Sequence, residues 1–197
     1  MKNLKSILLS ACVLLFAGTV SAQKIKVISG DIAVLKTETS LNTEFTYDAN
    51  IQVGKKTEKT YVAEKKSELN KKEPGRGDMW ALAWVGDRKT KYEPKFNELL
   101  ADNGYTVEST AKYTLLVHTI AVEPGYNVYV SRKNAEIDLE VSVVETANKS
   151  NVVAKISVMN APGRTFWGND FDAGVRIQEC YATAGKYLAK YLKKGKK

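Results

Sequence analysis

Few residues of this chain have the types and spacing that catalysis requires. The single histidine, His118, lies between Val117 and Thr119 in an apolar segment. Any Ser-His-Asp triad or Cys-His dyad would have to include it. Leu116 and Ile120 share its face, so we expect a buried histidine with satisfied polar atoms. A transition-metal site needs several His or Cys ligands. We therefore expect no metal site, no cofactor and no enzymatic activity.

An acidic row could in principle hold calcium. Glu136, Asp138 and Glu140 alternate along one face of a predicted strand. Calcium prefers roughly six to eight oxygens that converge from a folded loop, whereas neighbours on one strand face lie about 7 Å apart. We expect a solvated acidic row that Lys155 balances.

Tryptophan and arginine provide the candidate binding surface. Trp80 and Trp84 share a helical face, Arg88 follows one turn later, and the segment 161–171 adds a second group. These residue types dominate binding hot spots and stack on sugar rings. The candidate residues for binding a ligand or partner are Trp80, Trp84, Arg88, Arg164, Phe166 and Trp167.

The direction of the two tryptophans depends on helix continuity. In an unbroken helix from Met79 to Asn103 they would point about 130° away from an apolar stripe. The predicted stripe consists of Leu82, Val85, Tyr92, Phe96, Leu99 and Leu100. The tryptophans would then need a second layer, such as segment 161–171, or a ligand. A break at Gly86 would reset this register.

Two strands and a helical region precede residue 104. Apolar residues alternate with polar ones from Leu41 to Tyr47, the period of a half-buried strand. A strand is also expected from Ile25 to Leu35, with a turn at residues 29–31. A lysine-rich helix is predicted from Glu58 to Lys71, and a second helix after Asp78, whose carboxylate suits an N-cap. Pro94 either begins a third helix or kinks the second.

The second half alternates strands with a final helix. Tyr113 to Val122 is apolar on both faces, which indicates a central, covered strand. Residues 135–143 and 152–159 form a predicted hairpin across 148–151 that sets Lys155 near the acidic row. The final helix, 172–194, has Ile177, Tyr181, Ala184, Leu188 and Leu192 at helical spacing. The fold class we predict is α+β, a two-layer sandwich of an antiparallel or mixed sheet with helices packed on one face.

The amino terminus predicts export. Lys2 and Lys5 precede an apolar run that ends in small residues before Gln23, which is the pattern of a signal peptide over residues 1–22. Residues 23–197 then form a single domain, in which we expect no transmembrane segment. Acylation at Cys12 is not expected, because it would leave an apolar leader on the mature chain. Cleavage lowers the net charge from +8 to about +6, which suits an anionic envelope polymer; no nucleic acid is expected for an exported protein.

The run "FTYDANIQVGKKTEKTYVAEK", a strand ending in Phe-x-Tyr-Asp and leading into a Glu-x-x-Tyr helix, resembles uncharacterised small exported proteins of Bacteroidota. The element order is similar to that of the TolB amino-terminal domain and the LpoB-type periplasmic lipoproteins. The resemblance covers most of the mature chain but no specific motif. It implies non-enzymatic work at the cell envelope and carries no functional residues across.

We therefore predict a non-catalytic, exported cell-envelope protein, periplasmic or associated with the outer membrane, that binds another envelope protein or serves in assembly. The alternative is a small glycan, peptidoglycan or lipid binder that uses the tryptophan and arginine surface.

Overall fold

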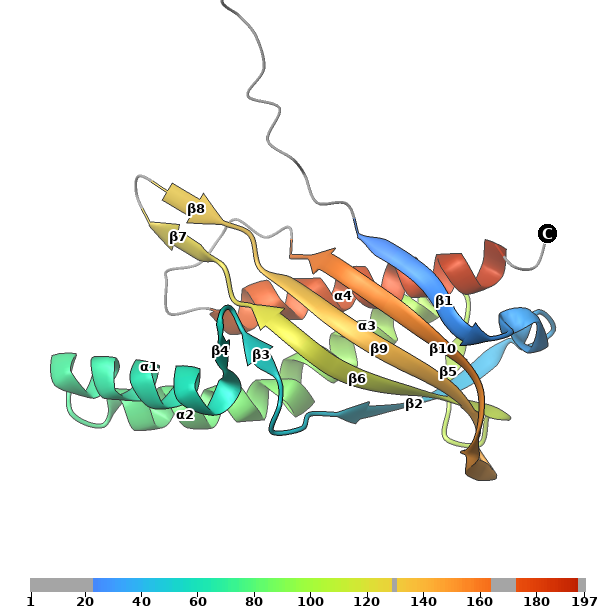
Figure 1. Ribbon diagram of the computed structural model, residues 1–197, viewed down its shortest axis with the longest axis horizontal. Helices are drawn as coiled ribbons and strands as arrows, with labels where there is room; N and C mark the ends of the chain where they lie inside the picture. Colours follow the sequence, from blue (N-terminus) through green and yellow to red (C-terminus); the bar gives the residue numbers. More distant parts are fainter. Residues whose placement is uncertain (1–22, 129–130, 164–172, 195–197) are drawn as a thin grey trace, which may run out of the picture.

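The computed structural model describes residues 23–128, 131–163 and 173–194. Within these ranges the chain forms a mixed eight-stranded sheet with helices packed on one face (Figure 1), which confirms the predicted α+β class. The predicted signal peptide, residues 1–22, lies outside the described residues. The strands of the sheet are β1 (Lys24–Gly30), β2 (Ser40–Thr46), β3 (Gln52–Val53), β4 (Lys56–Thr57), β5 (Thr106–Val107), β6 (Tyr113–Glu123), β9 (Glu136–Glu145) and β10 (Asn148–Pro162).

Strand β6 lies in the middle of the sheet. The strand order is β1-β10-β9-β6-β2-β5, with β3 also paired to β6. The pairs β1–β10, β10–β9 and β9–β6 are antiparallel, whereas β2 and β3 run parallel to β6. A separate two-stranded ribbon joins β7 (Tyr126–Val128) to β8 (Ser131–Lys133).

The predicted β9–β10 hairpin forms, but its turn is earlier than expected. Glu145 pairs with Asn148, so the chain reverses at residues 146–147 and not across 148–151. The register shifts between Asn148 and Val152, between Val152 and Ala154, and again between Val158 and Ala161. It is regular from Ala154 to Val158. Lys155 Nζ lies 3.0 Å from Glu140 Oε1, as the pattern predicted.

The helices are α1 (Glu58–Lys72), α2 (Arg76–Asp87), α3 (Glu93–Ala101) and α4 (Ala173–Lys194), with a short 3-10 turn, η1 (Ile32–Leu35), and a π-helical turn, η2 (Arg88–Tyr92), between α2 and α3. The start of α2 corrects the prediction: the helix begins at Arg76, after Gly75 in the left-handed conformation at φ 84°. Asp78 therefore lies inside the first turn and is not the N-cap. Glycine adopts this conformation without steric cost, so it can end one helix and begin the next.

Helices α3 and α4 cover one face of the sheet and pack closely on each other (Figure 1). The rings of Tyr92 and Tyr181 stack at 5.1 Å between centroids. Close packing requires Gly185, because a Cβ at that position would overlap the carbonyl oxygen of Phe96. The five residues predicted to form the core stripe of the last helix are all buried.

No helix of the described ranges covers the other face of the sheet, on which polar side chains lie among apolar ones such as Leu116 and Ile120. His118 lies on this face, with its side chain 34% exposed. Its Nδ1 lies 3.0 Å from Thr46 Oγ1, and its Nε2 lies 3.3 Å from Asp48 Oδ2. The predicted satisfied histidine is therefore correct, but its predicted burial is wrong, because β6 is covered on one face only.

The α1–α2 hairpin extends past the end of the sheet (Figure 1). Its two helices approach closely at Gly77, where a Cβ would overlap the carbonyl oxygen of Lys66. The amide of Gly77 donates to Asn70 Oδ1 at 2.7 Å, and Lys66 forms an ion pair with Asp78 at 2.6 Å. The hydrogen bond from Lys66 lowers the pKa of the Asp78 carboxyl group. The hairpin is thus a packed unit, although its tip lies beyond the sheet.

Two glycine-to-alanine changes should have opposite effects. Gly185→Ala should lower the free energy of unfolding by about 1–3 kcal/mol, because α3 and α4 must move apart. Gly86→Ala should instead raise it by up to about 1 kcal/mol, because the space around Gly86 is open and alanine favours helix. Urea denaturation of both variants measures the difference. Equal effects would contradict the described packing.

Candidate functional site

The base of the α1–α2 hairpin is tied together by one carboxylate. Glu58, the first residue of α1, accepts a hydrogen bond from Trp84 Nε1 at 2.7 Å. Arg88 Nη2 donates to both oxygens of the same carboxylate at 2.6 Å. The side chains of Glu58 and Arg88 are 18% and 17% exposed. The charged pair is thus largely shielded from water, which strengthens its attraction.

A layer of tyrosines lies beneath this carboxylate. The Arg88 guanidinium stands 4.5 Å above the ring of Tyr47. The Tyr181 hydroxyl lies 2.6 Å from Thr119 Oγ1. Burial is the main cause that raises the pKa values of Tyr47, Tyr92 and Tyr181. Among the described residues, the Tyr92 hydroxyl has no hydrogen-bond partner, whereas the Tyr47 and Tyr181 hydroxyls lie close enough to affect each other's pKa. Burial therefore favours the neutral form of all three phenols.

The cavity between these side chains is too small for an organic ligand. Its volume is about 10 Å³, room for about one water molecule. Pockets for small molecules measure roughly 300–1,000 Å³. The cavity beside Arg88 therefore has no room for an organic ligand in the described part of the chain.

Trp80 and Trp84 pack with Tyr61 of α1. The two indole rings are 5.4 Å apart, and Tyr61 lies 6.0 Å from Trp80 and 5.2 Å from Trp84. Trp84 is only 6% exposed, whereas Trp80 is half-buried. The second layer that the tryptophans were predicted to need is provided at least in part by α1.

The predicted apolar stripe of the second helix is wrong at its first two members. Leu82 and Val85 are exposed, while Tyr92, Phe96 and Leu100 are buried. The cause is the π-helical turn at Arg88–Tyr92, which has more residues per turn than an α-helix and shifts the register. Helix α2 therefore turns a different side inward from the one that continuity with α3 would give.

Arg164, Phe166 and Trp167 lie outside the described residues. Their predicted role in binding, like that of Trp80 and Arg88, stays a prediction.

The side of α2 opposite α1 is apolar and exposed. We define the α2 face as Met79, Leu82, Ala83, Val85 and Gly86, all of which are exposed. Leu82 is 75% exposed. Four of the five residues follow the spacing i, i+3, i+4, i+7, which is that of a helix stripe that packs on a partner. This stripe was missed because the sequence pattern assigned Leu82 and Val85 to the core.

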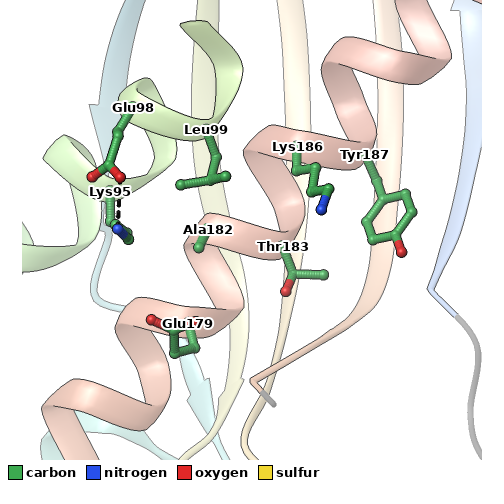
Figure 2. A pocket seen from close by; sticks show the side chains of 8 residues that line it. All are labelled: Lys95, Glu98, Leu99, Glu179, Ala182, Thr183, Lys186 and Tyr187. Carbon is green, nitrogen blue, oxygen red and sulfur yellow. Dashed lines mark hydrogen bonds and ion pairs between the residues drawn. The ribbon is translucent and has the colours of Figure 1, made fainter. Parts of the chain in front are cut away.

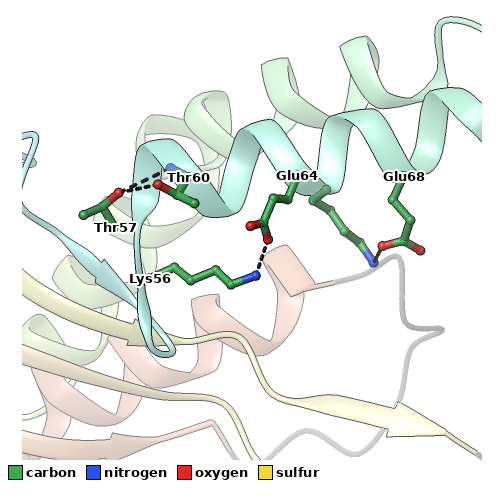
Figure 3. A network of polar contacts seen from close by, with 6 residues as sticks. Lys56, Thr57, Thr60, Glu64 and Glu68 are labelled. Carbon is green, nitrogen blue, oxygen red and sulfur yellow. Dashed lines mark hydrogen bonds and ion pairs between the residues drawn. The ribbon is translucent and has the colours of Figure 1, made fainter.

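The outer surface of α1 is of the opposite kind. Lys56 pairs with Glu64 (Figure 3), and Lys72, further along the helix, pairs with Glu68 at 2.6 Å. Thr57 caps the helix by accepting from the amide of Thr60. Exposed pairs such as these are solvated and contribute little to stability. The projecting hairpin thus combines a charged outer surface on α1 with an apolar one on α2.

A groove of about 330 Å³ lies between α3 and α4 (Figure 2). Lys95 and Glu98 line one wall and pair at 2.7 Å. Glu179, Lys186 and Tyr187, all from α4, line the opposite wall. The groove carries charges of both signs and therefore selects no single charged ligand.

The fold and the site together define an α+β sandwich with a projecting helical hairpin. No described helix is long and apolar enough to span a membrane, and no cluster of His, Cys, Asp and Glu in the described ranges could hold a metal ion.

No family model and no curated protein match the chain. Solved structures that resemble it include a PelC dodecamer from Paraburkholderia phytofirmans and a single-residue variant of the same dodecamer. They share 12% and 13% identity with this chain, each at a TM-score of 0.35, and each comparison covers 82% of this chain and 96% of the PelC chain. Likeness at this level carries nothing known of PelC over to this protein.

Removing the charge of Glu58 should loosen the hairpin. Glu58→Gln should lower the free energy of unfolding by about 2–3 kcal/mol, because Arg88 loses its charged partner in a shielded position. Glu64→Gln is the matched control on the exposed side of α1, and it should change stability by less than about 0.5 kcal/mol. Thermal or urea unfolding measures both. A Glu58→Gln variant as stable as the Glu64→Gln control would refute the anchoring role.

Proposed function

We propose that this chain is a non-catalytic, exported protein of the cell envelope that binds another protein through the α2 face. The observation that carries the proposal is the exposure of Leu82 at the centre of an apolar helix stripe. Soluble domains normally turn such a stripe inward, and exposed apolar patches commonly mark interaction sites. A partner helix fits best, because Ala83 and Gly86 leave room for its backbone.

Three further features support this proposal. The amino-terminal pattern favours export. Trp84, a candidate for sugar stacking, is buried with its indole N–H bonded to Glu58. A catalytic triad or dyad would depend on His118. Each ring nitrogen of His118 lies close to a polar partner on the open face of the sheet.

A photo-crosslinking amino acid at position 82 tests the binding surface. In the native host, irradiation should join the chain to a protein through position 82, because this side chain is the most exposed large apolar one among the residues that the structure describes. Position 152 is the control, since Val152 is also exposed and apolar but lies on β10. Absence of a position-82 adduct, or equal adducts at both positions, would count against the α2 face as a protein-binding surface.

The glycan alternative has its own test. In a Trp167→Phe background, only Trp80 and Trp84 remain as fluorophores among the three tryptophans of the chain. Titration with muropeptides or oligosaccharides should leave their emission maximum unchanged, because Trp84 is buried and Trp80 packs on Tyr61. A saturable shift would support the sugar-binding alternative instead.

A further inference from the structure

We infer that the protein bound by the α2 face is a second copy of this chain, with the two α2 helices antiparallel about a two-fold axis at Leu82. This inference rests on the proposed function and specifies its partner. It is carried by the arrangement of residues on the α2 face and by the charges at the two ends of α2.

The α2 face is self-complementary in this arrangement. A two-fold axis requires the same patch on both copies, so that residue i meets j and j meets i. With Leu82 on the axis, the Leu82 side chains meet each other, and Met79 of each copy lies opposite Gly86 of the other. No heavy atom of the chain lies within 4 Å of the Cβ position at Gly86. A protruding methionine thus meets a glycine on each side of the axis.

Small residues beside the stripe permit close contact between the helices. Ala83 and Gly86 lie on the same side of the stripe as Met79, so backbone can approach backbone there. Packed helices commonly lie about 8–10 Å apart, with the distance set by the side chains at the contact. The small residues thus allow a distance between the helix axes near the lower end of this range. At that distance Leu82 and Met79 make van der Waals contact with the second copy.

The charges at the two ends of α2 select the antiparallel direction. Asp78 lies at the amino-terminal end, and Lys89, which is 76% exposed, lies just beyond the carboxyl-terminal end. Antiparallel pairing places Asp78 of one copy within about one helical turn of Lys89 of the other, whereas parallel pairing opposes like charges. Within one chain Asp78 pairs with Lys66 and Lys89 pairs with Glu93. Because each charge already has a partner in its own chain, the contacts between the two copies determine the orientation of the helices more than the affinity of the dimer.

The size of the α2 face indicates weak association. Helix α2 has 12 residues, a length of about 18 Å, and stable interfaces bury roughly 1,200–2,000 Å² in total. One helix pair falls below that range, so we expect a dimer that forms at high local concentration. A lipid surface is the main alternative occupant, but helices that lie in membranes present Trp, Phe and Leu, and the α2 face has no aromatic residue.

Single cysteines test the geometry. In a Cys12→Ser background the remaining native thiol, Cys180, is buried. Under mild oxidation of concentrated protein, Leu82→Cys should form a disulfide-linked dimer, because the two positions meet at the axis. Met79→Cys alone and Gly86→Cys alone should stay monomeric, since each lies about 9–12 Å along the axis from its own copy. A mixture of the two should give the mixed dimer.

The outcomes separate the second copy from other partners. Self-linked dimers of Met79→Cys, Leu82→Cys and Gly86→Cys alike would replace the antiparallel arrangement with a parallel one. Absence of every disulfide, with a position-82 photo-adduct of a different protein or a lipid, would overturn the second copy as partner. A photo-adduct with a different protein would still leave the proposed protein-binding function standing.

Sedimentation equilibrium provides an independent readout that does not depend on disulfide formation. Leu82→Glu should raise the dimer dissociation constant about tenfold or more, because it places two carboxylates at the axis. The variant should keep its fold, since position 82 is exposed. Val152→Glu, at an exposed apolar position on β10, should leave the dissociation constant unchanged. An equal effect of both substitutions, or a monomer at every concentration of the unmodified chain, would overturn the inference.

Discussion

The orientation of the α1–α2 hairpin depends on the carboxylate of Glu58. This one group begins α1 and binds Trp84 and Arg88 near the end of α2 and the start of η2. Arg88 in turn stands over Tyr47, just beyond the end of β2. Because the Glu58 carboxylate is largely shielded from water, loss of Trp84 or Arg88 as its partner would destabilise the fold. The hairpin is therefore held at its base, and its far end needs no support from the sheet.

This anchoring has a consequence for the outer surface. Because Trp80 and Trp84 are turned toward Tyr61 on α1, the opposite side of α2 is left with Met79 and Leu82. Helices α3 and α4 already cover one face of the sheet, and the α1–α2 hairpin extends past the end of the sheet, so α2 does not bury its outer side against the sheet. The α2 face, which the described residues leave exposed, is available for another molecule, and Ala83 and Gly86 favour a partner helix.

Much of the fold followed from periodicity alone. The strands around Phe45 and Ile137 and the stripe through Leu188 are correct, because each repeats its pattern over several residues. The sequence could not show the π-helical turn at Arg88–Tyr92, which leaves no mark in hydrophobic period. Because this turn shifts the helix register, Leu82 and Val85, which were predicted to be core residues, lie on the surface. The Glu58 contacts join positions 26 and 30 residues apart, and a pairing at such distance has no local signal.

The proposed function requires that protein covers the α2 face in the envelope. Maleimide reactivity of Leu82→Cys, compared in intact envelopes and in dilute purified protein, measures this most directly. Val152→Cys corrects for access of the reagent. We expect position 82 to be protected in envelopes and reactive after purification, while position 152 reacts in both. Equal reactivity of position 82 in the two settings would contradict it.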